Sequence, residues 1–467
     1  MELGFETIGN ATVICYDRGP VLVTDPWLVG SAYFGSWILS HEIPEQQMEA
    51  MTRCKYVWVS HGHPDHLSVD SLQLLRGKQI LLPDHYGGRI HRELEGLGLS
   101  GQILPDRTWH DLSDKLRVMC IADYNQDAVL LVDLGGVLFI NLNDANDTGW
   151  GQFVRETVRG YKTTFLAALS GYGDADMMNF FDEDGHRIPP AAAKKIPPGL
   201  DIALRVERYG ARFFIPFSSM HRYQRRDSIW ANEYTTSLAD YPKGFHSKTA
   251  EILPAYIRYD CVTGSLEALN PAEVPARVVE PEEFGDNWAD PLGRDDMVKI
   301  SKYFQPIRHL AEIFSHITLR VGGRDYTVGL GGRKKKKSIT FEVPRHSLIR
   351  AIEWQVFDDL LIGNFMKTTM HGIGRDGVHR SLYPDFSPYV AKYADNGGAR
   401  TPGELKAYFK AYRRRDPLGF LYHRLGLRVD SFMQNTIGTL FRARVPRGSR
   451  TYAAMKRTYR HIVNHES

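Results

Sequence analysis

Cysteine is scarce in this chain, and the four that it has lie far apart: Cys15, Cys54, Cys120 and Cys261. No two of them form a CxxC pair, and none belongs to a CxH motif. The sequence therefore offers neither an iron–sulfur cluster nor a cysteine-based zinc site. The cysteines stand mostly in or beside apolar, strand-like stretches, where we expect buried, reduced thiols.

Long apolar runs are also missing, because no stretch approaches the roughly 20 residues that a transmembrane helix needs. Residues 1–6 are acidic and lack the apolar segment of a signal peptide, so we expect a cytoplasmic protein. The net charge of +3 is too small to indicate a nucleic-acid partner, and we expect none.

The first 270 residues alternate short apolar strands with turns and helical stretches. Residues 4–8, 11–15 and 21–25 form an opening meander, and further strands are expected over 79–82, 116–122, 128–132 and 137–140. A helical stretch over 69–75 separates two of the strands. This pattern predicts an α/β fold in which two packed sheets are flanked by helices, here called the N-terminal unit (1–270).

The character of the chain changes at Pro271. Residues 271–296 are acidic and contain prolines, and we interpret them as a linker or arm. The C-terminal unit (297–467) begins with a predicted helix over 297–315, followed by a hairpin of 317–321 and 324–330, a strand over 338–343 and further helices. It is expected to be an α+β domain whose basic tail, between 442 and 460, is solvated rather than bound to an anionic membrane surface.

The most informative segment is His61-Gly62-His63-Pro64-Asp65-His66, which directly follows the apolar run 56–60. His61 and His63 are two residues apart, so their side chains can face the same way and hold one metal ion. Asp65 and His66 follow round the turn, where they can serve a second metal or orient the first pair. Core packing does not explain this hexad, because buried imidazoles and carboxylates need partners.

Further ligands are expected at the ends of other strands. Asp144 follows the run 137–143, where its carboxylate could bridge two metals or form an Asx turn. His221 follows the run 213–220 and is a candidate for the second site, although a histidine there can also be structural. Asp123 follows the run 116–122 in the same way and competes with Asp127 for a metal.

These residues resemble two families. The hexad matches the HxHxDH signature of the metallo-β-lactamase fold. The segments 24–28, 57–60, 66–68 and 141–144, together with Trp37 and His41-Glu42, resemble the cytidine monophosphate-N-acetylneuraminic acid hydroxylase family. This similarity runs from roughly 21 to 217 and is weaker around 358–363. The resemblance implies an αββα metallo-β-lactamase sandwich with a C-terminal α+β domain.

The chain departs from these families in two respects. The hydroxylase family carries an N-terminal Rieske domain, whereas this chain begins at the meander. If the chain is an oxygenase, we expect its electrons to come from a separate electron-transfer protein or from a different reductant. Most hydrolases of the fold place a histidine where Asp123 falls. His61, His63 and Asp123 would make a two-histidine, one-carboxylate set suited to ferrous iron. Asp65, His66 and His221 would make a second site, with Asp144 shared.

The leading prediction is an oxygenase or hydroxylase that uses two metal ions, with iron favoured and zinc possible. Its substrate would be a small polar molecule of a biosynthetic or sugar-nucleotide-like kind, and Asp65 and Asp144 would be catalytic. The alternative is a hydrolase of a phosphodiester, lactone or amide, in which a metal-bound hydroxide attacks and Asp65 orients the water. A third interpretation is a binding scaffold without catalysis.

Overall fold

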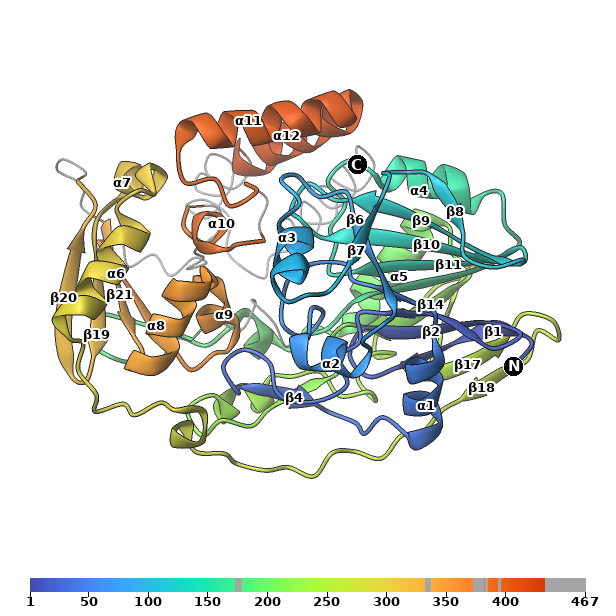
Figure 1. Ribbon diagram of the computed structural model, residues 1–467, viewed down its shortest axis with the longest axis horizontal. Helices are drawn as coiled ribbons and strands as arrows, with labels where there is room; N and C mark the ends of the chain where they lie inside the picture. Colours follow the sequence, from blue (N-terminus) through green and yellow to red (C-terminus); the bar gives the residue numbers. More distant parts are fainter. Residues whose placement is uncertain (173–178, 332–336, 373–381, 383–384, 394–395, 433–467) are drawn as a thin grey trace, which may run out of the picture.

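The computed structural model describes residues 1–172, 179–331, 337–372, 382, 385–393 and 396–432. Two sheets form the N-terminal unit, on the right of the view, and a third sheet lies in the C-terminal unit on the left (Figure 1). The predicted basic tail between 442 and 460 lies outside the described residues.

The first sheet has eight strands in the order β18-β17-β1-β2-β3-β5-β6-β7. Its members are β1 (Leu3–Ile8), β2 (Thr12–Asp17), β3 (Pro20–Thr24), β5 (Tyr56–Trp58), β6 (Gln79–Pro83), β7 (Gly101–Leu104), β17 (Ile257–Asp260) and β18 (Leu266–Ala268). Its pairs are antiparallel as far as β3 and parallel from β3 to β7. The helices that accompany this sheet are α1 (Glu45–Arg53), α2 (Val69–Leu74) and α3 (Arg89–Gly96).

The second sheet has seven strands in the order β16-β14-β12-β11-β10-β9-β8. Its members are β8 (Trp109–Asp111), β9 (Leu116–Ala122), β10 (Ala128–Leu134), β11 (Val137–Asn143), β12 (Thr163–Leu169), β14 (Phe213–Phe217) and β16 (Glu251–Ile252). Helices α4 (Gly151–Val158) and α5 (Pro198–Tyr209) accompany it, with the short 3-10 helices η2 (Ala191–Lys194) and η3 (Ile229–Glu233). Strands β4 (Trp37–Leu39) and β15 (His221–Tyr223) pair separately.

Strand β2 illustrates why the two sheets pack face to face between helices. Val13 and Cys15 belong to a buried cluster shared by both sheets, whereas Ile14 and Tyr16 belong to the cluster that includes α1 and α2. Successive side chains of a strand point to opposite faces, so both faces of this strand are buried. The predicted α/β sandwich with helices outside is therefore confirmed. Three of the four cysteines are buried and the other is half-buried, and none forms a disulfide.

The C-terminal unit contains the five-stranded sheet β13-β22-β21-β19-β20. Its members are β13 (Phe180–Phe181), β19 (Phe314–Val321), β20 (Arg324–Gly329), β21 (Lys337–Glu342) and β22 (Lys367–His371). Strand β13 comes from the N-terminal unit and pairs in parallel with β22. The division of the chain at 270 and 297 therefore stays a prediction, since one edge of this sheet is supplied by the earlier residues.

The helices of the C-terminal unit are α6 (Arg294–Phe304), α7 (Arg308–Ile313), α8 (Arg345–Trp354), α9 (Phe357–Ile362), α10 (Ser387–Val390), α11 (Pro402–Arg415) and α12 (Pro417–Phe432). The single helix predicted over 297–315 is wrong. It divides at Pro306, because proline has no N–H to donate, and β19 begins at Phe314. None of the described helices combines the length and apolar character needed to span a membrane.

Besides strand β13, the arm and the last two described helices connect the units. The arm, which includes the short 3-10 helix η4 (Pro281–Phe284), runs along the bottom of the view, and α11 and α12 lie across the top (Figure 1). In the arm, the carboxylate of Asp286 accepts hydrogen bonds from the Arg225 guanidinium at 2.8 Å and from the backbone N–H of Ser347 at 2.8 Å. At the top, the Tyr412 hydroxyl donates to the carbonyl oxygen of Asp123 at 2.6 Å. The C-terminal unit is thus fastened to the sandwich at both ends.

Candidate metal centre

The hexad lies where several strands of the two sheets end. His61 follows β5, Asp25 follows β3, Asp144 follows β11 and Ser218 follows β14. The backbone N–H of Ser60 donates to Asp25 Oδ1 at 2.7 Å. Interactions between these strand ends bring together side chains that are more than 150 residues apart in sequence.

The first group of donor atoms comes from two histidines and one carboxylate. His61 Nε2 lies 3.0 Å from His63 Nδ1 and 3.8 Å from Asp144 Oδ2. One ligand atom of each residue lies within 4.8 Å of the others. The Ser60 hydroxyl lies 2.9 Å from the remaining nitrogen of His61, Nδ1, and fixes the orientation of that ring. This group is suited to a single metal ion.

His66 lies between three carboxylates. Its Nε2 is 3.4 Å from Asp65 Oδ2 and 3.6 Å from Asp144 Oδ2, and its Nδ1 is 3.2 Å from Asp25 Oδ2. Asp144 thus lies between His61 and His66, which is the position that a shared ligand would take. The Ser218 hydroxyl donates to Asp144 Oδ1 at 2.5 Å and holds this carboxylate in place.

Asp65 is held by its surroundings. Its carboxylate accepts hydrogen bonds from Asn10 Nδ2 at 2.9 Å and from the Tyr33 hydroxyl at 2.6 Å. Burial alone would raise the pKa of this carboxyl, but His66 and Tyr33 outweigh burial and hold the pKa below its ordinary value. Asp65 is therefore favoured as a carboxylate with a fixed orientation.

The two central histidines differ in electrostatics. Burial, with the neighbouring His66 and His63, lowers the pKa of His61 well below its ordinary value. Burial would also lower the pKa of His66, but Asp65, Asp144 and Asp25 raise it well above that value. The lowered pKa favours the neutral form of His61, which is the form that binds a metal. The carboxylates around His66 instead favour a positive charge at that position.

The C-terminal unit contributes two carboxylates that the sequence analysis did not assign to the site. His63 Nε2 lies 3.4 Å from Asp358 Oδ2, and His63, Asp358 and Asp359 form a second group of donor atoms within 4.8 Å of one another. The signal for these two carboxylates in the sequence was a pair of acids within the apolar run of α9, where burial requires partners.

The close approach of the C-terminal unit also explains the glycine of the hexad. A glycine is needed at Gly62, because a Cβ there would lie 2.3 Å from the ring of Tyr393.

The structure separates Asp123 from Asp127. Asp127 Oδ1 lies 3.7 Å from His61 Nδ1, and burial followed by the charge of Asp144 raises the Asp127 pKa to about 7. Asp123 Oδ1 accepts hydrogen bonds from the Tyr124 N–H at 2.6 Å and from the Thr148 hydroxyl, and its buried Oδ2 has no hydrogen-bond partner among the described residues. Asp123 belongs to no group of three donors in the described part of the chain, and its role as a ligand stays a prediction.

His221 lies in β15, and its ring stacks on the indole of Trp37 with centroids 3.4 Å apart and planes at 3°. It belongs to no group of three donors among the residues that the structure describes. This stacking matches the structural role that the sequence left open for a histidine at a strand end, and metal binding by His221 stays a prediction.

Several residues of the site have unusual backbone conformations. Asp25, Tyr33, Asn143 and Ser218 have φ between 39° and 57°, a region that residues other than glycine rarely adopt. Three of the four stand at strand ends beside the hexad. Strained backbone of this kind persists where the surrounding structure enforces it, and it is concentrated at functional sites.

The charge balance of the site fits a metal cation. Six buried or half-buried carboxyl groups lie around the three histidines: Asp25, Asp65, Asp127, Asp144, Asp358 and Asp359. Within the described residues, no lysine or arginine forms an ion pair with any of them. Buried negative charge is costly unless it is paired or coordinates a metal. Imidazole and carboxylate donors suit iron and zinc.

Comparison with known proteins gives partial matches. No protein-family model matches the chain. The chain is 32% identical over 160 residues to the cytidine monophosphate-N-acetylneuraminic acid hydroxylase of Danio rerio, a match that covers 32% of this chain and 27% of that protein. The chain therefore matches only about a quarter of the length of this curated relative.

Among solved structures, a metallo hydrolase from the archaeon Ignicoccus hospitalis is 12% identical with a TM-score of 0.36, covering 55% of this chain and 98% of that one. A diiron β-hydroxylase from Streptomyces venezuelae is 13% identical with a TM-score of 0.33, covering 46% of this chain and 45% of that one. The chain thus combines a helix-flanked sandwich with an HxHxDH hexad like that of the metallo-β-lactamase fold, and over 32% of its length it is similar to a cytidine monophosphate-N-acetylneuraminic acid hydroxylase.

Proposed function

We propose that the chain is a metal-dependent oxygenase that uses non-haem iron to hydroxylate a small polar molecule of a biosynthetic or sugar-nucleotide-like kind. The observation that carries this proposal is the group of His61, His63 and Asp144, with donor atoms within 4.8 Å of one another. Two histidines and one carboxylate are the ligand set of ferrous oxygenases, which leaves positions for oxygen and substrate. The partial similarity to a hydroxylase supports the same reaction class.

The residues of the chain would divide the work as follows. His61, His63 and Asp144 would hold the iron, which when bound would supply the activation of oxygen. Asp358 would orient the His63 ring through Nε2, in the way that carboxylates orient metal-bound histidines. With Asp144 shared, Asp65 and His66 would hold a second metal.

Electrons would come from a separate electron-transfer protein. The chain has only four scattered cysteines, so it offers no cluster site of its own.

Metal analysis together with oxygen uptake tests this proposal. Protein purified without added metal should contain iron and should consume oxygen in the presence of ascorbate. Zinc as the resident metal, with turnover of a generic phosphodiester, would contradict the oxygenase and support the hydrolase. Protein that is isolated without metal and takes up none would support a binding scaffold.

Two variants test which carboxylate belongs to the first metal. Asp144→Asn should lose most of the bound iron, whereas Asp123→Asn should retain it, because only Asp144 lies in the group with His61 and His63. The reverse result would restore Asp123 as the third ligand. His63→Ala should lose iron or zinc alike, so it tests the site and not the reaction.

A further inference from the structure

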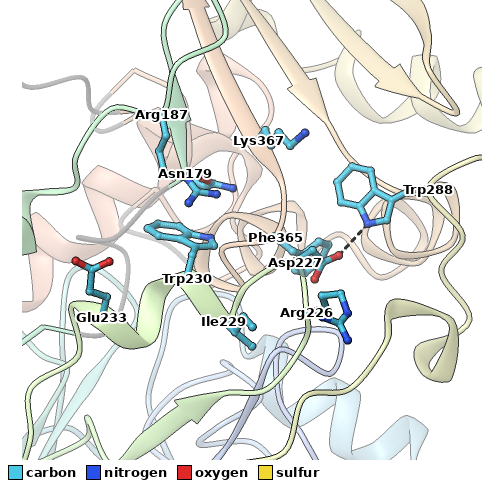
Figure 2. A pocket seen from close by; sticks show the side chains of 10 residues that line it. All are labelled: Asn179, Arg187, Arg226, Asp227, Ile229, Trp230, Glu233, Trp288, Phe365 and Lys367. Atoms are coloured by element: carbon cyan, nitrogen blue, oxygen red, sulfur yellow. Dashed lines mark hydrogen bonds between the residues drawn. The ribbon is translucent and has the colours of Figure 1, made fainter.

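A cavity of about 600 Å³ lies between the two units, and none of its lining residues belongs to the metal centre. Its wall combines residues beside β13 and η3, one residue of the arm and two residues of the C-terminal unit: Asn179, Arg187, Arg226, Asp227, Ile229, Trp230, Glu233, Trp288, Phe365 and Lys367 (Figure 2). The volume lies within the range of pockets that bind small molecules.

Arg187 is held in place by its contacts, while its terminal nitrogens have no hydrogen-bond partner among the described residues. The guanidinium carbon lies 4.2 Å from the centroid of the Trp230 ring, and Nε donates to Asn179 Oδ1 at 3.0 Å. Among the described residues, no carboxylate forms an ion pair with Arg187 and its terminal nitrogens have no hydrogen-bond partner. A planar fork of donors, already fixed by stacking, is suited to a carboxylate or a phosphate.

The other cations of the wall are neutralised by acids. Arg226 donates to Glu280 at 2.6 Å, and Lys367 donates to Glu342 at 2.9 Å. Arg187 is therefore the cation of this wall that lacks an acidic partner within the described part of the chain.

Asn179 supplies a second, independent indication of a ligand. The residue is 2% exposed, and its Oδ1 already accepts a hydrogen bond from Arg187 Nε. Its Nδ2 is buried without a hydrogen-bond partner among the described residues. A buried donor without a partner costs free energy, and an anion bound at Arg187 would satisfy it.

Aromatic rings make up much of the remaining wall. The Trp230 indole nitrogen donates to the carbonyl oxygen of Asn364 at 3.0 Å, and that of Trp288 donates to Asp227 Oδ2 at 2.9 Å. Figure 2 shows the two indoles with Phe365 between them. Rings fixed in this way provide flat, apolar surface at little entropic cost to a ligand.

We propose that this cavity binds a small molecule that carries a carboxylate or phosphate on a flat ring. The anionic group contacts the terminal nitrogens of Arg187 and the Nδ2 of Asn179, and the ring packs against the aromatic wall. This binding does not depend on the metal centre or on the reaction proposed for it.

Calorimetric titration of the full chain with phenyl phosphate tests the proposal. The wild-type protein should show saturable binding at one site, and Arg187→Met should weaken that binding by at least about tenfold, since a hydrogen bond to a charged group is lost. Inorganic phosphate should bind more weakly than phenyl phosphate. Equal affinity for the two would overturn the assignment of the ring to the aromatic wall.

Three further variants keep the test decisive. Arg350→Met is the matched control, because Arg350 stacks on the exposed Trp354 at 4.4 Å outside the cavity, and binding should be unchanged. Asn179→Asp places a carboxylate beside Arg187 and should abolish binding even if Arg187→Met fails to fold. His63→Ala should bind as the wild type does. Binding lost in His63→Ala but kept in Arg187→Met would place the ligand at the metal centre and overturn the proposal.

Discussion

Two of the places where the molecule buries charge are built differently. At the first, the fully buried Arg225 donates to Asp227 at 3.0 and 2.9 Å, to Asp286 at 2.8 Å and to the carbonyl oxygen of Phe34 at 2.9 Å. Its guanidinium carbon also lies 4.0 Å from the centroid of the Phe365 ring. At the second, the metal centre, carboxylates converge on histidines without any arginine or lysine partner in the described part of the chain.

The Arg225 cluster is a structural ion-pair cluster, whereas the charges of the candidate metal centre are suited to binding a cation. At Arg225 the chain supplies both signs of charge and the hydrogen bonds, so the cluster is complete on folding. At the candidate metal centre the chain supplies imidazole and carboxyl groups without a lysine or arginine partner among the described residues, so a bound cation would supply the compensating positive charge. Stability should therefore respond oppositely when a charge is removed from one place or the other.

The largest effect is expected from breaking the complete cluster. Arg225→Met leaves Asp227 and Asp286 without their buried partner, and should lower the free energy of unfolding by about 3–5 kcal/mol in chemical denaturation. Arg226→Met is the neighbouring control, since Arg226 pairs with Glu280 on the surface, and it should show no measurable change. A similar loss of unfolding free energy in both variants would contradict the conclusion that the Arg225 cluster stabilises the fold more than a surface ion pair does.

The second-largest effect on stability is expected from removing the metal. At a free metal concentration 100 times Kd, ferrous iron should stabilise the protein by about 3 kcal/mol, because it binds the folded chain. Thermal unfolding under anaerobic conditions, with iron or with a chelator, measures this difference. His63→Ala should unfold at the same temperature in both conditions. An equal response of this variant and the wild type would show that iron acts elsewhere.

A smaller effect is expected from the carboxylate that reaches the centre from α9. Asp358→Asn should weaken metal affinity about 10–100-fold by loosening the orientation of His63, as measured by competition with a chromogenic chelator. Asp325→Asn changes an exposed acid in β20 and should leave the affinity unchanged. If Asp358→Asn also leaves it unchanged, the C-terminal unit has no part in metal binding.

The smallest expected change in unfolding free energy is the one whose sign distinguishes the metal centre from the Arg225 cluster. Burial, followed by the charge of Asp358, raises the pKa of Asp359 well above its ordinary value. In metal-free protein, Asp359→Asn should therefore raise the free energy of unfolding, by about 1 kcal/mol at neutral pH. Asp286→Asn should lower it, because Asp286 is paired. Destabilisation by both substitutions would contradict the proposed contrast.

Sequence patterns predicted the parts of this molecule that are local. The β2 strand, the α2 helix and the arrangement of His61 beside His63 each follow from periodicity or spacing over a few residues. Pro306 was also visible in the sequence, yet the apolar period on both sides of it concealed the break in the predicted helix. Local spacing therefore predicted the sandwich and the proximity of His61 to His63, whose role as metal ligands stays a prediction.

The rest of the centre depends on contacts that spacing does not encode. Asp25 lies 41 residues from His66 and Asp358 lies 295 residues from His63 by sequence number, and only the folded sheets and α9 bring them within reach. The choice between Asp123 and Asp127 was equally beyond the sequence, because it depends on how the turn after β9 is held by Tyr124 and Thr148.

Strand β13 has a consequence for how the chain is made. Phe180 pairs with Thr368, so at the roughly 5–20 residues per second of translation the early strand waits on the order of 10–40 s for its partner. During that interval a ribosome-bound chain carries an unpaired strand, and the sheet of the C-terminal unit cannot gain its edge from newly made residues alone. A C-terminal fragment expressed by itself would have β22 as an uncovered edge, the kind of edge at which sheets associate with other chains.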